Sequence, residues 1–106
     1  MTQRLIKNIF LSDGRHLGFI EGNFLYSRDG VYMGWLEGEI AWDKDGNFRG
    51  VLTSLQGNLY ILNDKFAISP SPRTPKVNGN VVAPNPPANI RAIMLPTGLV
   101  DGFLKA

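Results

Sequence analysis

The sequence has no cysteine and a single histidine among its 106 residues. Without cysteine, a disulfide framework, a thiol nucleophile and a cysteine-ligated metal site are excluded. A zinc site needs about three or four ligands, which one histidine and no cysteine do not supply. We therefore expect neither a metal site nor a cofactor.

The sequence also lacks long hydrophobic runs and a strong charge imbalance. No apolar run approaches the roughly 18 residues of a membrane-spanning helix, and the first residues lack the apolar region of a signal peptide. The formal net charge of +2 is too small to imply a nucleic-acid partner by itself. The expected protein is cytoplasmic and has no membrane partner.

The main feature that is present is a sixteen-residue repeat between Ile9 and Leu52. Each unit reads aromatic, two residues, Asp-Gly, three residues, Gly and two apolar residues. Its glycines are Gly14, Gly18, Gly30, Gly34, Gly46 and Gly50. Within the repeat an acid-glycine pair recurs every eight residues, and the six residues between pairs are rich in aromatic and aliphatic side chains.

This spacing predicts short strands joined by tight turns, because strands of about six residues with two-residue turns give such a period. Asp-Gly suits a type I′ turn, in which both central residues have positive φ. Glu-Gly suits it less well, so alternate turns are expected to differ. The predicted strands cover 4–12, 15–20, 23–28, 31–36, 39–44 and 47–52, with less regular ones near 58–62 and 65–69, after a turn at Asn63-Asp64. The expected fold class is all-β, an antiparallel meander of Asp-Gly-tipped hairpins.

Two-residue turns also fix a register and two faces. With turns at Asp29-Gly30 and Glu37-Gly38, Tyr26 faces Met33 and Trp35 faces Ile40. The predicted core face carries Leu17, Phe19, Phe24, Tyr26, Met33, Trp35, Ile40, Trp42 and Val51. The opposite face carries His16, Gly18, Leu25, Ser27, Tyr32, Gly34, Leu36, Ala41, Asp43, Phe48 and Gly50.

Three glycines of the opposite face, Gly18, Gly34 and Gly50, fall at one level and define the glycine belt. Glycine inside a strand usually marks a bend or a close approach by other groups. Either neighbouring backbone packs onto the belt, which the three-fold recurrence favours, or the belt is the floor of a ligand groove. The walls of that groove would be the candidate site residues His16, Tyr32, Asp43 and Phe48.

Six of the seven prolines lie between Pro70 and Pro87. Such a stretch cannot join a sheet ladder and favours an extended conformation or disorder. Its two Pro-x-x-Pro spacings are typical of polyproline II ligands, but a covering loop is the favoured interpretation. We expect a single domain, 1–106, with a proline-rich loop at 69–88.

The segment 89–106 returns to the repeat pattern after the proline-rich loop. Residues 89–95 can form a strand, and Gly98 and Gly102 reproduce the glycine spacing of the earlier units. A last copy that returns after a long excursion predicts a pseudo-four-fold, closed or barrel-like ring in which C-terminal and N-terminal elements meet. Such closure would bury the exposed sheet edges.

The sequence contains Gly14-Arg-His-Leu-Gly-Phe-Ile-Glu-Gly, Arg28-Asp-Gly-Val-Tyr-Met-Gly-Trp-Leu and a proline-rich tail ending in Leu-Pro-Thr-Gly. These stretches resemble the small bacterial proteins called four-fold beta-flower domain proteins. The resemblance covers 9–52 well and the tail loosely, and the irregular segment 53–69 departs from it. It implies an all-β fold with a pseudo-four-fold arrangement of hairpins, but no established activity and no catalytic residues.

Residues that could carry chemistry are few. His16 would have to serve any Ser-His-Asp triad, with Asp43 or Asp101 as its acid, but no serine lies in a recognisable nucleophile context. No glycine-rich phosphate loop is present. The acids of the Asp-Gly pairs are explained by their turns, where Asp bonds nearby backbone. We therefore expect that the protein is not an enzyme.

Two functions fit these features. The favoured one is a module that binds a protein or peptide partner or associates with itself, given the aromatic content, the two-faced sheet and the proline-rich segment. The alternative is single-stranded nucleic-acid binding, in which aromatics on a β surface stack bases and cations hold phosphates. Those cations would be Arg15, Arg28, Lys44 and Arg49. Most aromatics are assigned to the core face, which favours the protein partner.

Overall fold

The protein is all-β, as expected. Its structure, a computed structural model, describes residues 4–103, so the end of the predicted C-terminal repeat lies outside the described residues. The strands are β1 (Ile6–Phe10), β2 (His16–Glu21), β3 (Phe24–Ser27), β4 (Tyr32–Glu37), β5 (Ile40–Asp43), β6 (Phe48–Leu55), β7 (Asn58–Asp64) and β8 (Leu99–Asp101). In this part of the chain no helix has the length and apolar character needed to cross a membrane.

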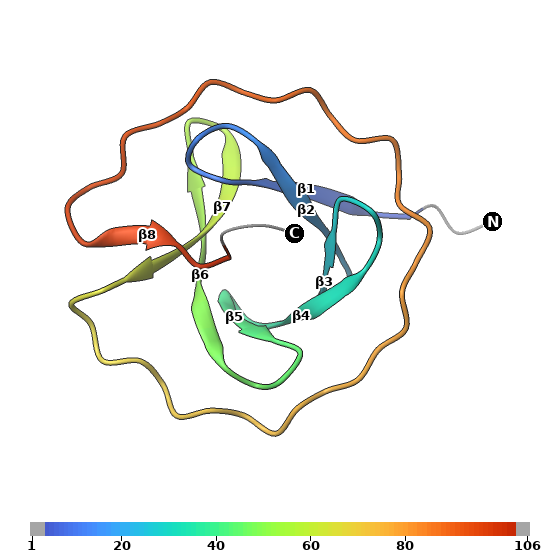
Figure 1. The fold of residues 1–106 in the computed structure, drawn as a ribbon, viewed down its shortest axis with the longest axis horizontal. Helices are drawn as coiled ribbons and strands as arrows, with labels where there is room; N and C mark the ends of the chain where they lie inside the picture. The colour runs from blue at the N-terminus through green and yellow to red at the C-terminus, as the bar shows by residue number, and fades with distance from the viewer. Residues whose placement is uncertain (1–3, 104–106) are drawn as a thin grey trace.

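Strands β1 to β7 form an antiparallel meander that closes into a barrel (Figure 1). The closing pair is β1 with β7, which run parallel, and Ile9 and Phe10 lie opposite Leu59 and Tyr60. Strand β8 adds to the far half of β7. The ring is therefore closed, as expected, but the strand that pairs with β1 is β7, which is long enough to pair with β1 along one half and with β8 along the other. The C-terminal segment still meets the N-terminal one at Asp101, whose carboxylate accepts the Ser12 N–H and hydroxyl at 2.9 and 2.7 Å.

The Asp-Gly hairpins do not form the two-residue type I′ turns that we expected. In the β3–β4 hairpin, the Ser27 N–H donates to the Val31 carbonyl at 2.8 Å and the Gly30 N–H donates to the Ser27 carbonyl at 2.9 Å. The loop therefore has three residues, and of these only Gly30 has a positive φ, 87°. This is the three-residue hairpin in which a left-handed glycine forms a bulge. The Ser27 hydroxyl supports it by accepting the N–H groups of Asp29 and Val31.

These turns change the register that two-residue Asp-Gly and Glu-Gly turns would give. The bulge places Tyr26 opposite Tyr32 instead of Met33. On the other side of β4, Glu37 pairs with Ile40, so the two-residue loop is residues 38–39. Trp35 consequently lies opposite Trp42 rather than Ile40, and their ring centroids are 6.5 Å apart.

Residues 65–98, here called the encircling loop, leave β7, pass once around the outside of the barrel and return to β8 (Figure 1). The strands expected near 65–69 and 89–95 do not form, and β7 continues through the expected turn at Asn63-Asp64. Asp64 ends β7 because its carboxylate and carbonyl accept the N–H groups of the next turn.

The encircling loop is attached to the hairpin tips through its backbone. The N–H groups of Arg73, Val81 and Ile90 donate to the carbonyls of Gly46, Gly30 and Gly14, respectively, at 2.8, 2.9 and 2.9 Å. A β-carbon on any of these three glycines would overlap the carbonyl oxygen of the same loop residue. The recurring tip glycine therefore serves close contact with the loop as well as the turn.

Both faces of the sheet are buried, which the two-face prediction did not anticipate. The barrel interior is filled mainly by aliphatic side chains, including Ile9, Ile20, Leu25, Leu36, Ala41 and Ile61, with Phe103. Four aromatics of the predicted core face, Phe19, Tyr26, Trp35 and Trp42, are buried on the outside of the barrel, and loop side chains lie over both tryptophans. Phe24, which was predicted to belong to the core, is exposed because it lies at the end of β3 away from the hairpin tip. The loop supplies a second covering layer, so the aromatic face does not have to point into the barrel.

The glycine belt lies against the backbone of the neighbouring strands. A β-carbon on Gly18 or Gly34 would overlap the carbonyl oxygen of Tyr26 or Trp42, and one on Gly50 would lie 2.6 Å from that of Leu62. This geometry agrees with the favoured packing explanation and leaves no groove on the belt itself.

Candidate functional site

The four candidate residues from the sequence do not form one site. We number the hairpin tips by their glycines: Gly14, Gly30 and Gly46 mark the first three, and Gly98 marks the fourth. Tyr32 and Asp43 line a shared cavity of 220 Å³ between the second and third tips. Phe48 lines a different cavity, between β6, β7 and the encircling loop. His16 lines neither of them.

His16 is packed against Phe10 at the start of β2, with ring centroids 5.7 Å apart. Its Nε2 lies 3.2 Å from the Asn8 Oδ1, and its buried Nδ1 has no hydrogen-bond partner within residues 4–103. Burial lowers the pKa of the imidazole and outweighs the interaction with the Gly18 backbone, which raises it; the charge of Arg28 lowers it slightly further. A neutral, enclosed ring at this position serves packing.

Asp43 is held in place by the turn that follows it. Its carboxylate accepts the N–H groups of Asp45 and Asn47 at 2.9 and 3.0 Å, and Arg49 Nε lies 3.0 Å away. Burial raises the pKa of this carboxyl, but these hydrogen bonds outweigh burial and leave the pKa below its usual value. The acid organises the third hairpin tip.

Tyr32 is likewise engaged with the encircling loop. Its hydroxyl donates to the Lys76 carbonyl at 3.0 Å, and burial raises the pKa of the phenol. Its backbone N–H donates to Asn80 Oδ1 at 2.9 Å. A neighbouring depression of 380 Å³ beside Tyr32 is lined by Lys44, Lys76 and other polar groups of the loop. The polar contacts of Tyr32 thus fix the loop to the barrel.

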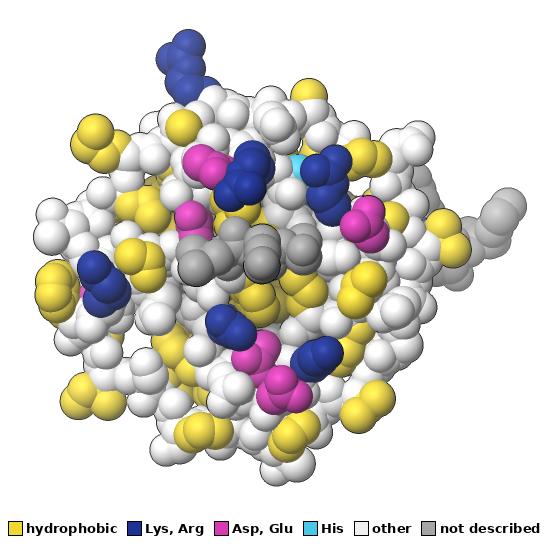
Figure 2. Space-filling view, viewed as in Figure 1, with side chains coloured by type: hydrophobic (Ala, Val, Ile, Leu, Met, Phe, Trp, Pro, Cys, Tyr) yellow, Lys and Arg dark blue, Asp and Glu magenta, His cyan; other side chains and the backbone are white. Residues whose placement is uncertain are grey.

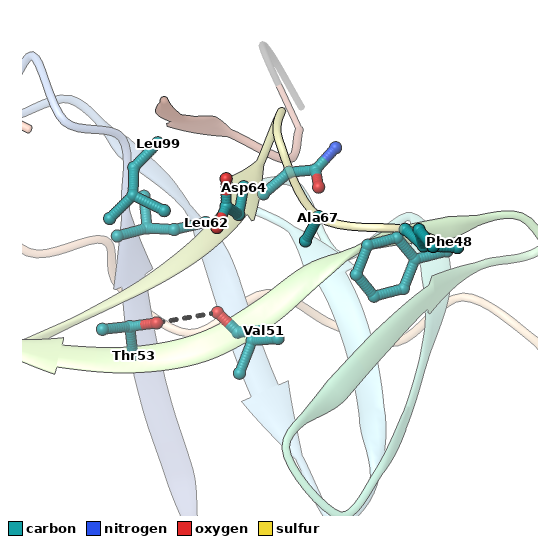
Figure 3. Close-up of a pocket in the computed structure, with 9 residues that line it drawn as sticks. Phe48, Val51, Thr53, Leu62, Asp64, Ala67 and Leu99 are labelled. Carbon is teal, nitrogen blue, oxygen red and sulfur yellow. Dashed lines mark hydrogen bonds between the residues drawn. The ribbon is translucent and has the colours of Figure 1, made fainter. Parts of the chain in front are cut away.

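The cavity next to Phe48 has mainly apolar walls, which come from the barrel and the loop together (Figure 3). Its volume is 170 Å³, which suits one large side chain. The lining residues that matter below are Phe48, Val51, Thr53, Leu62, Asp64 and Leu99. We call it the open quadrant.

The hairpins explain why this quadrant is open. The last residue pairs before the four tips are Phe10 with His16, Tyr26 with Tyr32, Trp42 with Phe48, and Asp64 with Leu99. Three hairpins thus place a buried aromatic ring at a position that is Asp64 in the fourth. An exposed carboxylate stands where a ring would otherwise fill the space.

The encircling loop does not fill the open quadrant either. Val81 and Ala83 pack against the cluster that contains Tyr26, and Ile90 and Ile93 pack against the cluster that contains Phe10. Beside the open quadrant, in contrast, the Phe66 and Ile68 side chains are 77% and 98% exposed.

Sequence reasoning found Phe48 but missed Asp64 and Leu62. The repeat predicts the next aromatic at position 58, which is Asn. Only the pairing of Asp64 with Leu99 identifies Asp64 as the structural equivalent of Phe10, Tyr26 and Trp42. The signal in the sequence was the interruption of the aromatic period, but without the register it did not point to a residue.

Charges on the viewed face of the molecule are mixed, and basic side chains lie beside acidic ones (Figure 2). Arg15 Nε lies 2.7 Å from Asp13, and Arg49 Nε lies 3.0 Å from Asp43. Within the described residues, no group of three or more His, Cys, Asp or Glu side chains is placed to hold a metal ion. This face presents no continuous basic surface.

Comparison with known proteins identifies the family. The model of the family described as "4-fold beta flower protein" matches residues 3–100, nearly the whole chain. Neither the search of curated proteins nor the search of solved structures gave a match. The match agrees with the all-β fold, and the chain belongs to the 4-fold beta flower family.

Proposed function

We propose that the protein is a recognition module that binds an extended segment of a partner protein at the open quadrant. The observation that carries this proposal is an apolar cavity between barrel and loop that no side chain of the described chain fills. Around the rest of the barrel, the same outer surface already holds an extended polypeptide, the encircling loop, through backbone hydrogen bonds at regular intervals.

The chemistry of the cavity supports a polypeptide ligand. Its floor is formed by Leu62 and Val51, and Val51 is 38% exposed. Exposed apolar side chains of the loop, Phe66 and Ile68, lie next to it and offer further contact area. Apolar surface of this kind, with a polar rim, is characteristic of interaction sites. A single-side-chain cavity fits a small, transient interface in the cytoplasm, and we assign it no catalytic role.

Nucleic-acid binding receives less support from the geometry. Base stacking needs exposed aromatic faces, and Phe19, Tyr26, Trp35 and Trp42 are at most 4% exposed. Two of the cations that would hold phosphates, Arg15 and Arg49, are paired with acids. The protein partner therefore remains the favoured proposal, with a second copy of this chain as one form of it.

A filling substitution tests the proposal. Peptides that bind the full chain would be selected from a random library, and their affinities then measured for two variants. Val51→Trp fills the cavity, whereas Val82→Trp places the same ring on the loop at a residue that is 82% exposed and outside the cavity. We expect binding to be lost in Val51→Trp and kept in Val82→Trp. Selected peptides that bind both variants equally would contradict the proposal.

A further inference from the structure

We infer that the open quadrant recognises a basic side chain, an arginine or lysine presented by an extended, proline-containing segment of the partner. The inference rests on the proposed function and names the chemistry of its ligand. The aliphatic stem would lie on Phe48, Val51 and Leu62, and the charged end would reach the carboxylate of Asp64.

The first argument is the position of Asp64. It shares the outer face of β7 with Leu62, and both line the cavity (Figure 3). The Phe66 N–H donates to its Oδ1 at 2.9 Å, which orients the carboxylate. Within residues 4–103 it has no ion-pair partner at salt-bridge distance. An oriented carboxylate without a cation, beside an apolar cavity, complements a side chain with an apolar stem and a positive end.

The second argument is that the chain already makes this contact elsewhere. At the third tip, where the loop covers the barrel, the Arg73 guanidinium lies 5.0 Å from the Trp42 ring centroid. Glu37 lies 3.5 Å from the Arg73 Nε and balances its charge. The outer ring comes from β5, the acid from β4 and the basic side chain from the proline-rich loop.

Three residues further along the loop, a lysine makes the cation–ring contact without an acid at salt-bridge distance within residues 4–103. The Lys76 ammonium lies 5.3 Å from the Trp35 ring centroid. Such contacts between a cation and an aromatic face are favourable in proteins. The open quadrant offers the ring of Phe48 and the acid Asp64, but the loop residues that pass it are Ala67 and Ile68. The missing part is the basic side chain, and the partner would supply it.

The probe for this inference is a synthetic peptide with the loop sequence Ser69–Lys76, which is extended by its prolines and carries arginine. It would be titrated into the full 15N-labelled chain and followed by NMR. We expect shifts of the amides of Val51, Leu62 and Asp64. Losing one exposed ion pair should weaken binding roughly fivefold, so Asp64→Asn should show that loss, and added salt should act in the same direction.

Matched variants separate charge from folding. Asn keeps the oxygen that accepts the Phe66 N–H, so Asp64→Asn preserves the turn. Asp29→Asn removes the same charge at the second tip, outside the cavity, and should leave the affinity unchanged. A leucine peptide, with leucine in place of both the arginine and the lysine, should bind more weakly to the wild-type chain, and the two peptides should bind equally to Asp64→Asn.

The outcomes distinguish the inference from the proposed function. If the leucine peptide binds the open quadrant as tightly as the arginine peptide, and Asp64→Asn changes neither, the basic side chain is refuted while the recognition module stands. The inference would also be refuted if the arginine peptide did not bind, or if it shifted only amides around the depression beside Tyr32 and Lys44. The proposed function itself fails only if Val51→Trp leaves the binding of selected peptides unchanged.

Discussion

The covered part of the barrel and the open quadrant use the same hairpin in two ways. In the covered part, a ring such as Trp42 lies in the last residue pair before the hairpin tip, and loop side chains close over it. In the open quadrant, Asp64 replaces the ring, and the adjacent loop residue Ile68 turns to solvent. The comparison teaches that one repeated element can be covered by the loop in three copies and can leave an apolar cavity in the fourth.

The largest expected effect concerns the covered part. Trp42 is fully buried between Trp35, Phe48 and the loop. Replacing it by alanine should reduce the free energy of unfolding by about 3–5 kcal/mol, a large share of the stability of a small domain. Chemical denaturation of Trp42→Ala would measure this. A variant that melts within a few degrees of wild type would show that the outer aromatic layer contributes little.

Replacing an aromatic residue by alanine in the open quadrant should lower the free energy of unfolding by a smaller amount. Phe48 is only half-buried, and one side of its ring faces the cavity. Phe48→Ala should therefore reduce the free energy of unfolding by about 1–2 kcal/mol. Equal losses for Phe48→Ala and Trp42→Ala in parallel denaturation curves would remove the distinction between covered and open regions.

The glycine belt gives a second test of close packing. A β-carbon on Gly34 would overlap the Trp42 carbonyl, so the extra atoms of Gly34→Val must displace a backbone. Overpacking should cost at least about 1–3 kcal/mol, although valine has the better strand propensity. Thermal denaturation and elution volume would test this. A Gly34→Val protein with wild-type stability and size would restore the ligand groove and its candidates His16 and Tyr32.

A smaller effect is expected from pH, and it too belongs to the covered part. Burial lowers the pKa of His16 in the folded state, so the unfolded chain binds the proton more readily. Stability should therefore be full above the unfolded pKa of about 6.5 and fall as the pH drops below it. His16 is the only histidine, so His16→Phe should flatten the stability profile between about pH 7 and 5. An unchanged profile would contradict an enclosed, neutral His16.

Much of the fold could be predicted because the spacing of glycines and aromatics is a local signal. Strand positions followed from the period, and the close packing at Gly34 followed from its recurrence. The register did not follow from the period. Ser27 supports a three-residue loop, and the bulge in this loop places Tyr26 opposite Tyr32 instead of Met33. The parallel β1–β7 contact joins residues far apart in the sequence and has no local signature.

The candidate site was less predictable for the same reason. The sequence predicted a buried aromatic face, which is confirmed for Trp35 and Trp42 but not for Phe24. It did not show that a proline-rich loop would bury this face from outside. Of the open quadrant, only Phe48 was named, because Asp64 becomes equivalent to Trp42 only through its pairing with Leu99. Sites formed between a repeat and a long loop depend on contacts that the repeat pattern does not contain.

Amide hydrogen exchange along the encircling loop tests the central claim most directly, because it reads the covered and open parts in one experiment. The N–H groups of Arg73, Val81 and Ile90 donate to the hairpin tips and should be protected. The amides of Ile68, Ser69 and Ser71, which pass the open quadrant without such bonds in the described structure, should exchange at rates near those of an unfolded chain. Uniformly fast exchange along residues 66–95, or uniform protection that includes Ile68, would contradict the account.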